Sequence, residues 1–279
     1  MDKDFWNSIA KNDYQVPEGN TLENLTDILF SYLGSTDPKL RDDIAYIVYA
    51  NWLKRKMYSS ETIKSHVDKL LSNLDKGIGE NESDMVFLRA FSILLLAEIV
   101  HNDNKKPLLE KDQIKTILAK SLWFLDAEKD PRGHIPVKGW AHAIAHTADL
   151  MLVLARNRNI EEADLWEMLA AISNKITHSK NYVYIHGEDE RLANTIIEIL
   201  RRDMVSLNQL DAWAKSFTKP DSKDWKGAYV DEERNRAFQN TRNLLRSIYL
   251  VMIAQPEDFP DREQLIRMFS NTLTELKPH

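Results

Sequence analysis

Three polar side chains follow a helical spacing within one apolar segment of the chain. His142, His146 and Asp149 stand at positions i, i+4 and i+7 of the segment 138–157, KGWAHAIAHTADLMLVLARN. That spacing places all three on one stripe of an α-helix. Nearly all the other residues of the segment are apolar, which is typical of a buried helix. We therefore expect the polar stripe to face a cavity or a buried polar network.

The residue types on this stripe suit metal chemistry. Two imidazoles and a carboxylate can hold Zn²⁺ or another divalent ion and leave positions open for water. The turn-rich segment 130–136 would place Asp130 and Arg132 near the start of the same helix. Arg132 could hold an anionic group through a bidentate contact. These residues together predict a metal-dependent hydrolase in which a metal-bound water is the nucleophile.

A structural network is the alternative interpretation of the same stripe, and we rank it first. His and Asp side chains in a core often hydrogen-bond each other and backbone carbonyls with no ligand present. The HxxxHxxD spacing is also looser than HExxH, and no Glu stands between His142 and His146 to act as a general base.

Two arginines interrupt apolar runs elsewhere in the chain. Arg41 lies with Asp42 in LRDDIAYIVY, and Arg89 lies in VFLRAFSILLL. A charge in a buried stripe must be paired or must reach water. We favour ion pairs between adjacent helices, and a position in the same groove as residues 130–149 is the alternative. Trp140 is interpreted as a packing residue before any role in ring stacking.

Helical periodicity dominates the chain and predicts an all-α fold. Expected helices lie near residues 21–33, 38–56, 60–75, 82–102, 107–126, 138–157, 161–178, 188–203, 207–217, 231–254 and 261–275. Their short links predict antiparallel helical hairpins over 21–56, 60–102, 107–157, 161–203 and 207–254, with a period of roughly 40 residues. We expect a HEAT- or armadillo-like right-handed α-solenoid in a single domain over 1–279, and a compact multi-helical array is the alternative. The segment 218–230 is either a lid or a long connection.

Composition excludes some fold classes and indicates which partners and which cell compartment to expect. With only 8 Gly and 9 Pro the chain lacks the turn residues that sheet and dinucleotide-binding folds need. A net charge of −6 without a basic block makes nucleic acid an unexpected partner. Cysteine is absent, which excludes disulfides and thiolate metal sites. The acidic start and the short apolar run 91–100 predict a cytoplasmic protein with no membrane partner.

The segment 130–151, DPRGHIPVKGWAHAIAHTADLM, resembles the DUF2785 family of uncharacterised bacterial proteins. Further similar segments are 37–42, 87–92 and 243–246. The function of this family is unassigned, so the resemblance implies no activity. It implies that one family pattern includes, and brings together in space, Arg41, Asp42, Arg89, Asp130, Arg132, Trp140, His142, His146 and Asp149.

Two classes of function follow. The first is a binding or scaffold module whose polar groove around 130–149 takes a protein, a peptide or a small molecule, because helical-repeat proteins mostly bind. The second is the hydrolase with His142, His146 and Asp149 as ligands of a divalent metal ion such as zinc. They differ in whether these three side chains converge on one point at metal–ligand distance.

Overall fold

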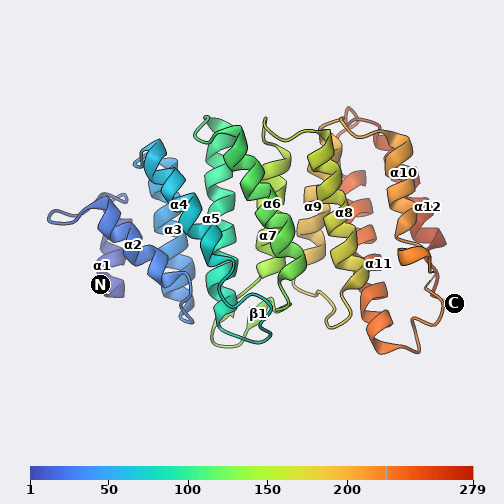
Figure 1. The fold of residues 1–279 in the computed structure, drawn as a ribbon, viewed down its shortest axis with the longest axis horizontal. Helices are drawn as coiled ribbons and strands as arrows, with labels where there is room; N and C mark the ends of the chain where they lie inside the picture. Colours follow the sequence, from blue (N-terminus) through green and yellow to red (C-terminus); the bar gives the residue numbers. More distant parts are fainter. Residues whose placement is uncertain (224, 279) are drawn as a thin grey trace. The chain divides into compact units, whose positions relative to one another are not determined.

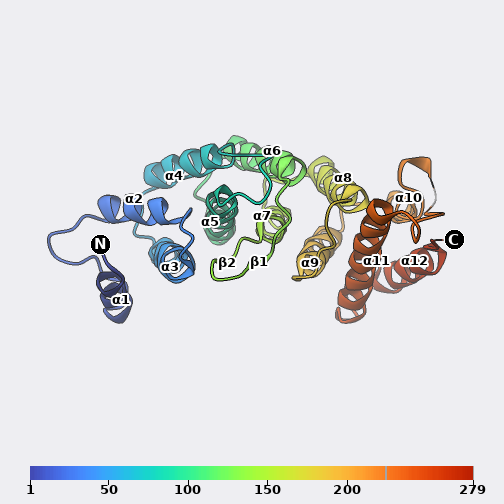
Figure 2. The ribbon, with the colours of Figure 1, turned by 90° about the horizontal axis from the view of Figure 1, so that it is seen from below.

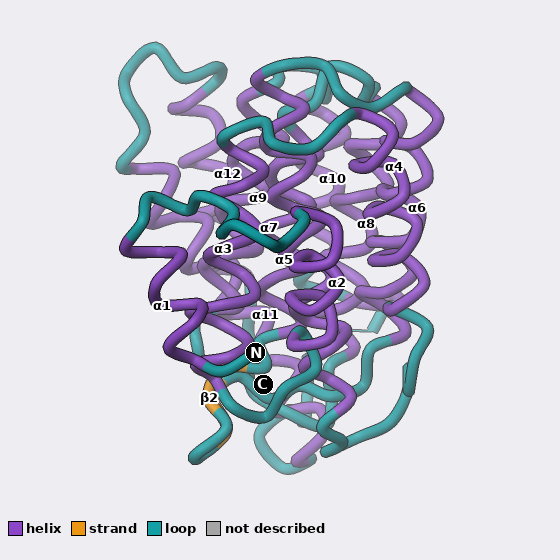
Figure 3. The backbone as a smooth tube through the Cα atoms, turned by 90° about the vertical axis from the view of Figure 1, so that its left-hand side faces the viewer, coloured by secondary structure: helices purple, strands orange, loops and turns teal. Residues whose placement is uncertain are grey.

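The computed structural model describes residues 1–223 and 225–278, and helices make up most of this part of the chain (Figure 3). The chain divides into two compact units, Met1–Leu150 and Met151–His279. We call them the N-terminal unit and the C-terminal unit. The boundary between them falls within one helix, Ala143–Ala155. The single domain over 1–279 stays a prediction.

The N-terminal unit contains two layers of helices. Figure 2 shows α2, α4 and α6 in one layer and α3, α5 and α7 in the other. Its elements are α1 (Lys3–Lys11), α2 (Leu22–Tyr32), the π-helix η1 (Lys39–Tyr46), α3 (Ile47–Lys54), α4 (Ser60–Asn73), α5 (Met85–Lys105), α6 (Lys111–Ala127), β1 (His134–Ile135), β2 (Gly139–Trp140) and α7 (Ala143–Ala155). The β1–β2 hairpin lies at one end of α5 and α7 (Figure 1).

The C-terminal unit is built around α11. Its elements are α8 (Glu162–His178), α9 (Glu188–Arg201), α10 (Leu207–Ser216), a 3₁₀ turn η2 (Pro220–Ser222), α11 (Glu232–Ile253) and α12 (Arg262–Glu275). Helix α11 packs against α8, α9 and α12, and α10 packs against α12. The predicted hairpin over 207–254 is therefore wrong in its pairing, because α12 is the main partner of α10.

Side-chain caps begin several helices where the sequence predicts a start. The hydroxyl of Thr21 accepts a hydrogen bond from the Asn24 N–H at 3.2 Å, and that of Ser59 accepts one from the Thr62 N–H at 3.1 Å. The Asp231 carboxylate accepts from the Arg234 N–H at 2.7 Å. Each cap satisfies a backbone donor that has no partner within its own helix. The predicted starts of α2, α4 and α11 are confirmed.

The expected helix over 138–157 is wrong in its first turn. Residues 139–140 form strand β2, and α7 begins at Ala143. Gly139 and His142 have φ of +78° and +59°, which lie outside the helical region. The expected helix over 38–56 begins as the π-helix η1 and continues as α3. Helix α1 was not predicted.

Helix α5 supplies much of the core of the N-terminal unit. By length and hydropathy alone it would be long enough to cross a membrane, but 67% of its apolar window is buried inside the protein. Core helices of water-soluble proteins have this composition too, so the sequence of α5 is explained by its packing. The cytoplasmic location stays a prediction.

A cluster of aromatic rings surrounds His66 between α2, α3 and α4. The imidazole lies 5.1 Å from the ring of Phe30 and 4.9 Å from that of Tyr58, measured between centroids. Its Nδ1 lies 3.0 Å from the hydroxyl of Tyr49, whose pKa burial raises. Burial, with a smaller effect from the positive charge of Lys69, lowers the pKa of His66 to about 4, whereas Asp27 opposes the shift. The cluster therefore favours a neutral imidazole that accepts the Tyr49 hydroxyl hydrogen.

Acid is expected to destabilise the protein through His66. Its pKa is lower in the folded protein than in the unfolded chain, so the unfolded chain binds more protons between about pH 6.5 and 4. The free energy of unfolding should fall as the pH is lowered through this window. Between about pH 7 and 5 we expect a loss of about 1 kcal/mol, a value reduced because the ring is partly exposed.

Urea unfolding of the wild type and of His66→Gln at both pH values measures this contribution. Gln can accept the Tyr49 hydrogen bond but does not titrate, so it removes the loss due to position 66 and leaves that due to carboxylates. Equal pH dependence of the two proteins would contradict the assignment.

Candidate functional site

The β1–β2 hairpin is the most exposed part of the predicted site. Its strands pair His134 with Trp140 and Ile135 with Gly139, and the Lys138 N–H donates to the Ile135 carbonyl at 3.2 Å. Pro136 and Val137 occupy the centre of this turn. Val137 has a φ of +68° and is 95% exposed. Proline followed by a residue of positive φ is the pattern of a type II turn, in which glycine or asparagine is the favoured second residue.

Arg41, on η1, binds the backbone of the hairpin. Its guanidinium is fully buried, lies 4.2 Å from the ring centroid of Phe87 and 4.8 Å from that of Phe91, and donates to the carbonyl oxygen of Lys138 at 2.9 Å. It also forms a bidentate contact with Asp42 at 3.1 and 3.2 Å. Burial lowers the pKa of Arg41 and raises the pKa of Asp42, and the contact between them opposes both shifts. The predicted ion pair between adjacent helices is wrong for Arg41, because its carboxylate partner is the next residue of η1; the contact with a neighbouring segment is instead the hydrogen bond to the Lys138 carbonyl.

The absence of a side chain at position 139 permits this contact. A Cβ atom there would lie 3.0 Å from the Cβ of Pro38 and 3.2 Å from Nη2 of Arg41. Gly139 also has a φ of +78°, which glycine adopts without steric cost. Both the close approach to η1 and the backbone conformation therefore require glycine at this position.

Asp130 and Arg132 form an ion pair in the segment that leads into β1. The Arg132 guanidinium donates to both carboxylate oxygens of Asp130, with the shortest contact at 2.6 Å, and to the carbonyl of Ser83 at 3.0 Å. The hydrogen bond from Arg132 to Asp130 raises the pKa of Arg132. Directly before β2, Lys138 forms an ion pair with Asp84 at 2.8 Å. The predicted anion-binding arginine is therefore already paired with a carboxylate.

Arg89 and Glu128 form an ion pair in which both side chains are fully buried. Nε and Nη2 of Arg89 donate to the two Glu128 oxygens at 2.6 and 3.0 Å. Nη1 donates to the backbone carbonyls of Lys76 at 3.1 Å and Gly77 at 2.7 Å. Glu128 also accepts the backbone N–H of Asp130 at 2.9 Å. This pair joins α5 to the turn after α4 and to the start of the hairpin segment.

Aromatic rings form a continuous series from the surface into the core. The Trp140 ring is stacked on that of His142 at 4.8 Å, and His134 contacts the edge of Trp140 at 5.0 Å. The next ring, that of His146, lies 5.8 Å from His142 and 5.2 Å from Phe91. Trp140 is 42% exposed, whereas His142 and His146 are 8% and 7% exposed. The two histidines thus pack between an exposed indole and the core.

The predicted stripe of His142, His146 and Asp149 is not arranged as a metal site. Among the described residues, no group of three His, Asp or Glu side chains could hold a metal ion. His142 precedes α7 in a left-handed conformation, and Nδ1 of His146 lies 3.1 Å from the carbonyl oxygen of Ala90. Asp149 lies further along α7 and is half-buried. The His146 N–H still donates to the His142 carbonyl at 2.9 Å, so the predicted i, i+4 relation of the two histidines is retained.

Sequence reasoning missed three residues on which this region depends. Glu128 follows the last turn of α6 and resembles a solvated helix-end carboxylate in the sequence, although it is 1% exposed. Val137 and Gly139 owe their importance to positive φ values. The dipeptide Pro136-Val137 and the glycine two residues later were the available signals of a turn.

The protein is mostly helical, with a short β-hairpin between α6 and α7 that ion pairs and the buried guanidinium of Arg41 hold in place. The family model of DUF2785, described as a protein of unknown function, matches residues 74–250 of this chain. The chain belongs to the DUF2785 family. The match includes Arg89 and the whole segment 130–149 but not Arg41. Neither the curated proteins nor the solved structures contain a match to the chain.

Gly139→Ala should destabilise the protein more than Gly79→Ala. Both glycines have positive φ, +78° and +82°, but a Cβ at Gly79 meets no atom within 4 Å. Both variants lose about 1 kcal/mol to backbone strain, and Gly139→Ala should lose about 2 kcal/mol more because the new methyl group overlaps Pro38 and Arg41. Urea unfolding measures both changes. Equal losses would show that the close approach to η1 contributes nothing.

Glu128→Gln should lower the free energy of unfolding by about 3 kcal/mol, because it leaves the buried charge of Arg89 without a counter-ion. Asp211→Asn is the matched control. It breaks a solvent-exposed pair with Lys215, 2.7 Å across, and should leave the free energy nearly unchanged. Chemical unfolding of the two variants at neutral pH tests the contrast, and a small effect of Glu128→Gln would count against the role assigned to the buried pair.

Proposed function

We propose that this protein is a helical binding module that presents the β1–β2 hairpin to an apolar segment of a partner protein. Val137 and Trp140 are the contact residues in this proposal. The two layers of helices in the N-terminal unit support a HEAT-like repeat as its wider architecture (Figure 2). The observation that carries the proposal is the conformation and exposure of Val137.

Valine at position 137 makes the folded protein less stable than glycine would. A β-branched side chain at φ of +68° costs about 1–2 kcal/mol relative to glycine. Because the side chain is 95% exposed, it recovers little of that cost through packing within the chain. Strained positions of this kind cluster where proteins bind ligands. A role in contact with a partner accounts for a valine at this position.

Trp140 supplies the second part of the contact surface. Its indole is 42% exposed, and the stack with His142 and the edge contact with His134 hold it in place. Tryptophan is enriched among the residues that contribute most to protein–protein binding. Because the ring is already positioned, less conformational entropy is lost when a partner binds.

The charges beside the hairpin favour an apolar contact. Arg132 is paired with Asp130, and Lys138 with Asp84. A ligand that relied on these cations would have to displace a carboxylate from each. The metal-dependent hydrolase has no comparable support, because the described residues contain no group of three His, Asp or Glu side chains that could hold a metal ion.

A photoreactive phenylalanine analogue placed at position 137 tests the proposal in cells. The same analogue at Trp123, a 39% exposed tryptophan on α6, is the control. We expect cross-links to a discrete partner from position 137 only. With the purified partner, Trp140→Ala should weaken binding by about 2 kcal/mol, roughly thirtyfold, and Trp123→Ala should leave it unchanged.

Val137→Gly separates binding from stability. It should raise the free energy of unfolding by about 1 kcal/mol because glycine adopts positive φ freely, and yet weaken binding of the partner. Identical cross-links from positions 137 and 123, or a dissociation constant that neither hairpin variant changes, would refute the proposal.

A further inference from the structure

A groove in the N-terminal unit lies between α2, α4 and the start of α5, and neither Val137 nor Trp140 lines it. Its volume of about 650 Å³ falls within the range of about 300–1,000 Å³ that small-molecule sites occupy. The apolar part of its lining includes Phe30, Met85 and Leu88. Phe30 is only 4% exposed, whereas Met85 is 37% exposed. Apolar surface of this kind suits a hydrocarbon chain.

A lysine is held at this groove by a buried amide. The ammonium group of Lys76 donates to Oδ1 of Asn73 at 2.8 Å. Asn73 is 4% exposed, and its Nδ2 donates to the hydroxyl of Ser92 in the core at 3.0 Å. The bond to Ser92 fixes the orientation of the amide, so its oxygen is directed toward Lys76. Lys76 itself is exposed, and this hydrogen bond ties its ammonium group to an amide whose orientation the core fixes.

The backbone that carries Lys76 is fixed as well. Arg89 donates to the carbonyl oxygens of Lys76 and Gly77 while it is paired with Glu128. Gly77 has a φ of +63°, and a Cβ there would lie 3.0 Å from the Cβ of Met85. The turn after α4 thus brings Lys76 beside the apolar wall of the groove in a defined conformation.

The charge of this lysine is not neutralised by an acid. Lys69, the other lysine of the groove, forms an ion pair with Asp27 at 2.8 Å and lies over the Phe30 ring. No carboxylate forms an ion pair with Lys76 among residues 1–223 and 225–278, and its hydrogen-bond partner is the neutral amide of Asn73. One positive charge is therefore available to an anion that enters the groove.

We propose that this groove binds a free apolar monocarboxylate, such as a medium-chain fatty acid. The hydrocarbon chain lies against Met85 and Leu88, and the carboxylate accepts a charge-assisted hydrogen bond from Lys76. This proposal uses none of the hairpin contacts, so it holds or fails independently of the proposed partner protein.

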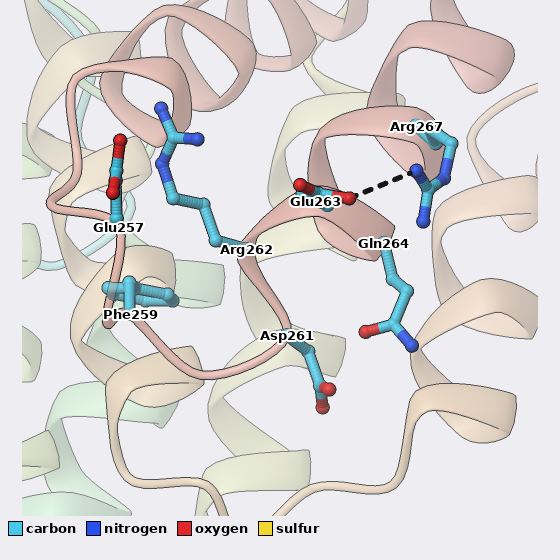
Figure 4. A pocket seen from close by; sticks show the side chains of 7 residues that line it. All are labelled: Glu257, Phe259, Asp261, Arg262, Glu263, Gln264 and Arg267. Atoms are coloured by element: carbon cyan, nitrogen blue, oxygen red, sulfur yellow. Dashed lines mark hydrogen bonds and ion pairs between the residues drawn. The ribbon is translucent and has the colours of Figure 1, made fainter.

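A hollow in the C-terminal unit, at the turn between α11 and α12, is a weaker candidate for the same chemistry (Figure 4). Its volume is also about 650 Å³, but Phe259 is its only apolar lining residue, so it has no surface for a hydrocarbon chain. Arg267 contacts Glu263 at 3.4 Å, and Arg262 donates to two backbone carbonyls.

Calorimetric titration of the full chain with laurate, and with lauryl alcohol as the uncharged analogue, tests the proposal. Laurate should bind, and the alcohol should bind about tenfold more weakly. Lys76→Gln should weaken laurate binding about tenfold and leave the affinity for the alcohol unchanged, whereas Lys76→Arg should retain laurate binding. Lys105→Gln, at the far end of α5, is the control for a lost surface charge and should bind as the wild type does.

Leu88→Trp is a second variant, which fills the groove and should abolish binding of both molecules. Thermal unfolding verifies that each variant is folded. Equal affinity for laurate and the alcohol, or unchanged laurate binding in both Lys76→Gln and Leu88→Trp, would overturn the proposal. Binding to phosphatidylglycerol vesicles without binding of laurate would also overturn it, because the ligand would then be a lipid surface.

Discussion

The buried ion pair between Arg89 and Glu128 is the interaction on which the N-terminal unit most depends. Two charges removed from water cost several kcal/mol each unless their hydrogen-bonding groups are satisfied. Here the guanidinium binds both oxygens of Glu128 and two backbone carbonyls of the turn after α4. Glu128 in turn accepts the N–H of Asp130. The pair therefore fixes, at once, the turn that carries Lys76 and the segment that leads into the hairpin.

Arg41, on η1, repeats the same principle earlier in the chain. Its guanidinium packs against Phe87 and Phe91 of α5 and binds the backbone of the hairpin at Lys138. Two buried arginines on neighbouring elements thus hold segments that have little regular hydrogen bonding of their own. A hairpin with strands of two residues is marginal by itself. These contacts explain why it has a defined conformation.

The helices were largely predictable because their signals are local. The caps at Thr21, Ser59 and Asp231 stand where the structure begins helices. The hairpin was not predictable in the same way. A helix over 138–142 satisfies the apolar periodicity, but the strand pairing of residues 139–140 and the positive φ values of Gly139 and His142 exclude it. At Gly139 the backbone also lies against Pro38 and Arg41, about a hundred residues away in the sequence, and periodicity does not report such a contact.

The candidate site shows the same division between local and distant information. Sequence reasoning identified Arg41 and Arg89 as charges that needed partners, and it placed Asp130 and Arg132 near the start of the same helix as the two histidines. It missed Glu128, because the end of a helix is where a solvated carboxylate is ordinarily found. The two histidines lie side by side as their spacing predicts, although α7 begins at Ala143 and His142 only precedes it.

Arg89 binds carbonyl oxygens in the turn after α4, and that choice has a consequence for how the protein can diverge. A carbonyl oxygen is present whatever side chain the residue carries, so an exchange of Lys76 leaves both hydrogen bonds to Arg89 in place. Only Gly77 is constrained by its backbone conformation. The backbone of this turn can therefore stay constant while the side chain at position 76 changes, so the charge beside the groove can change without a change of fold.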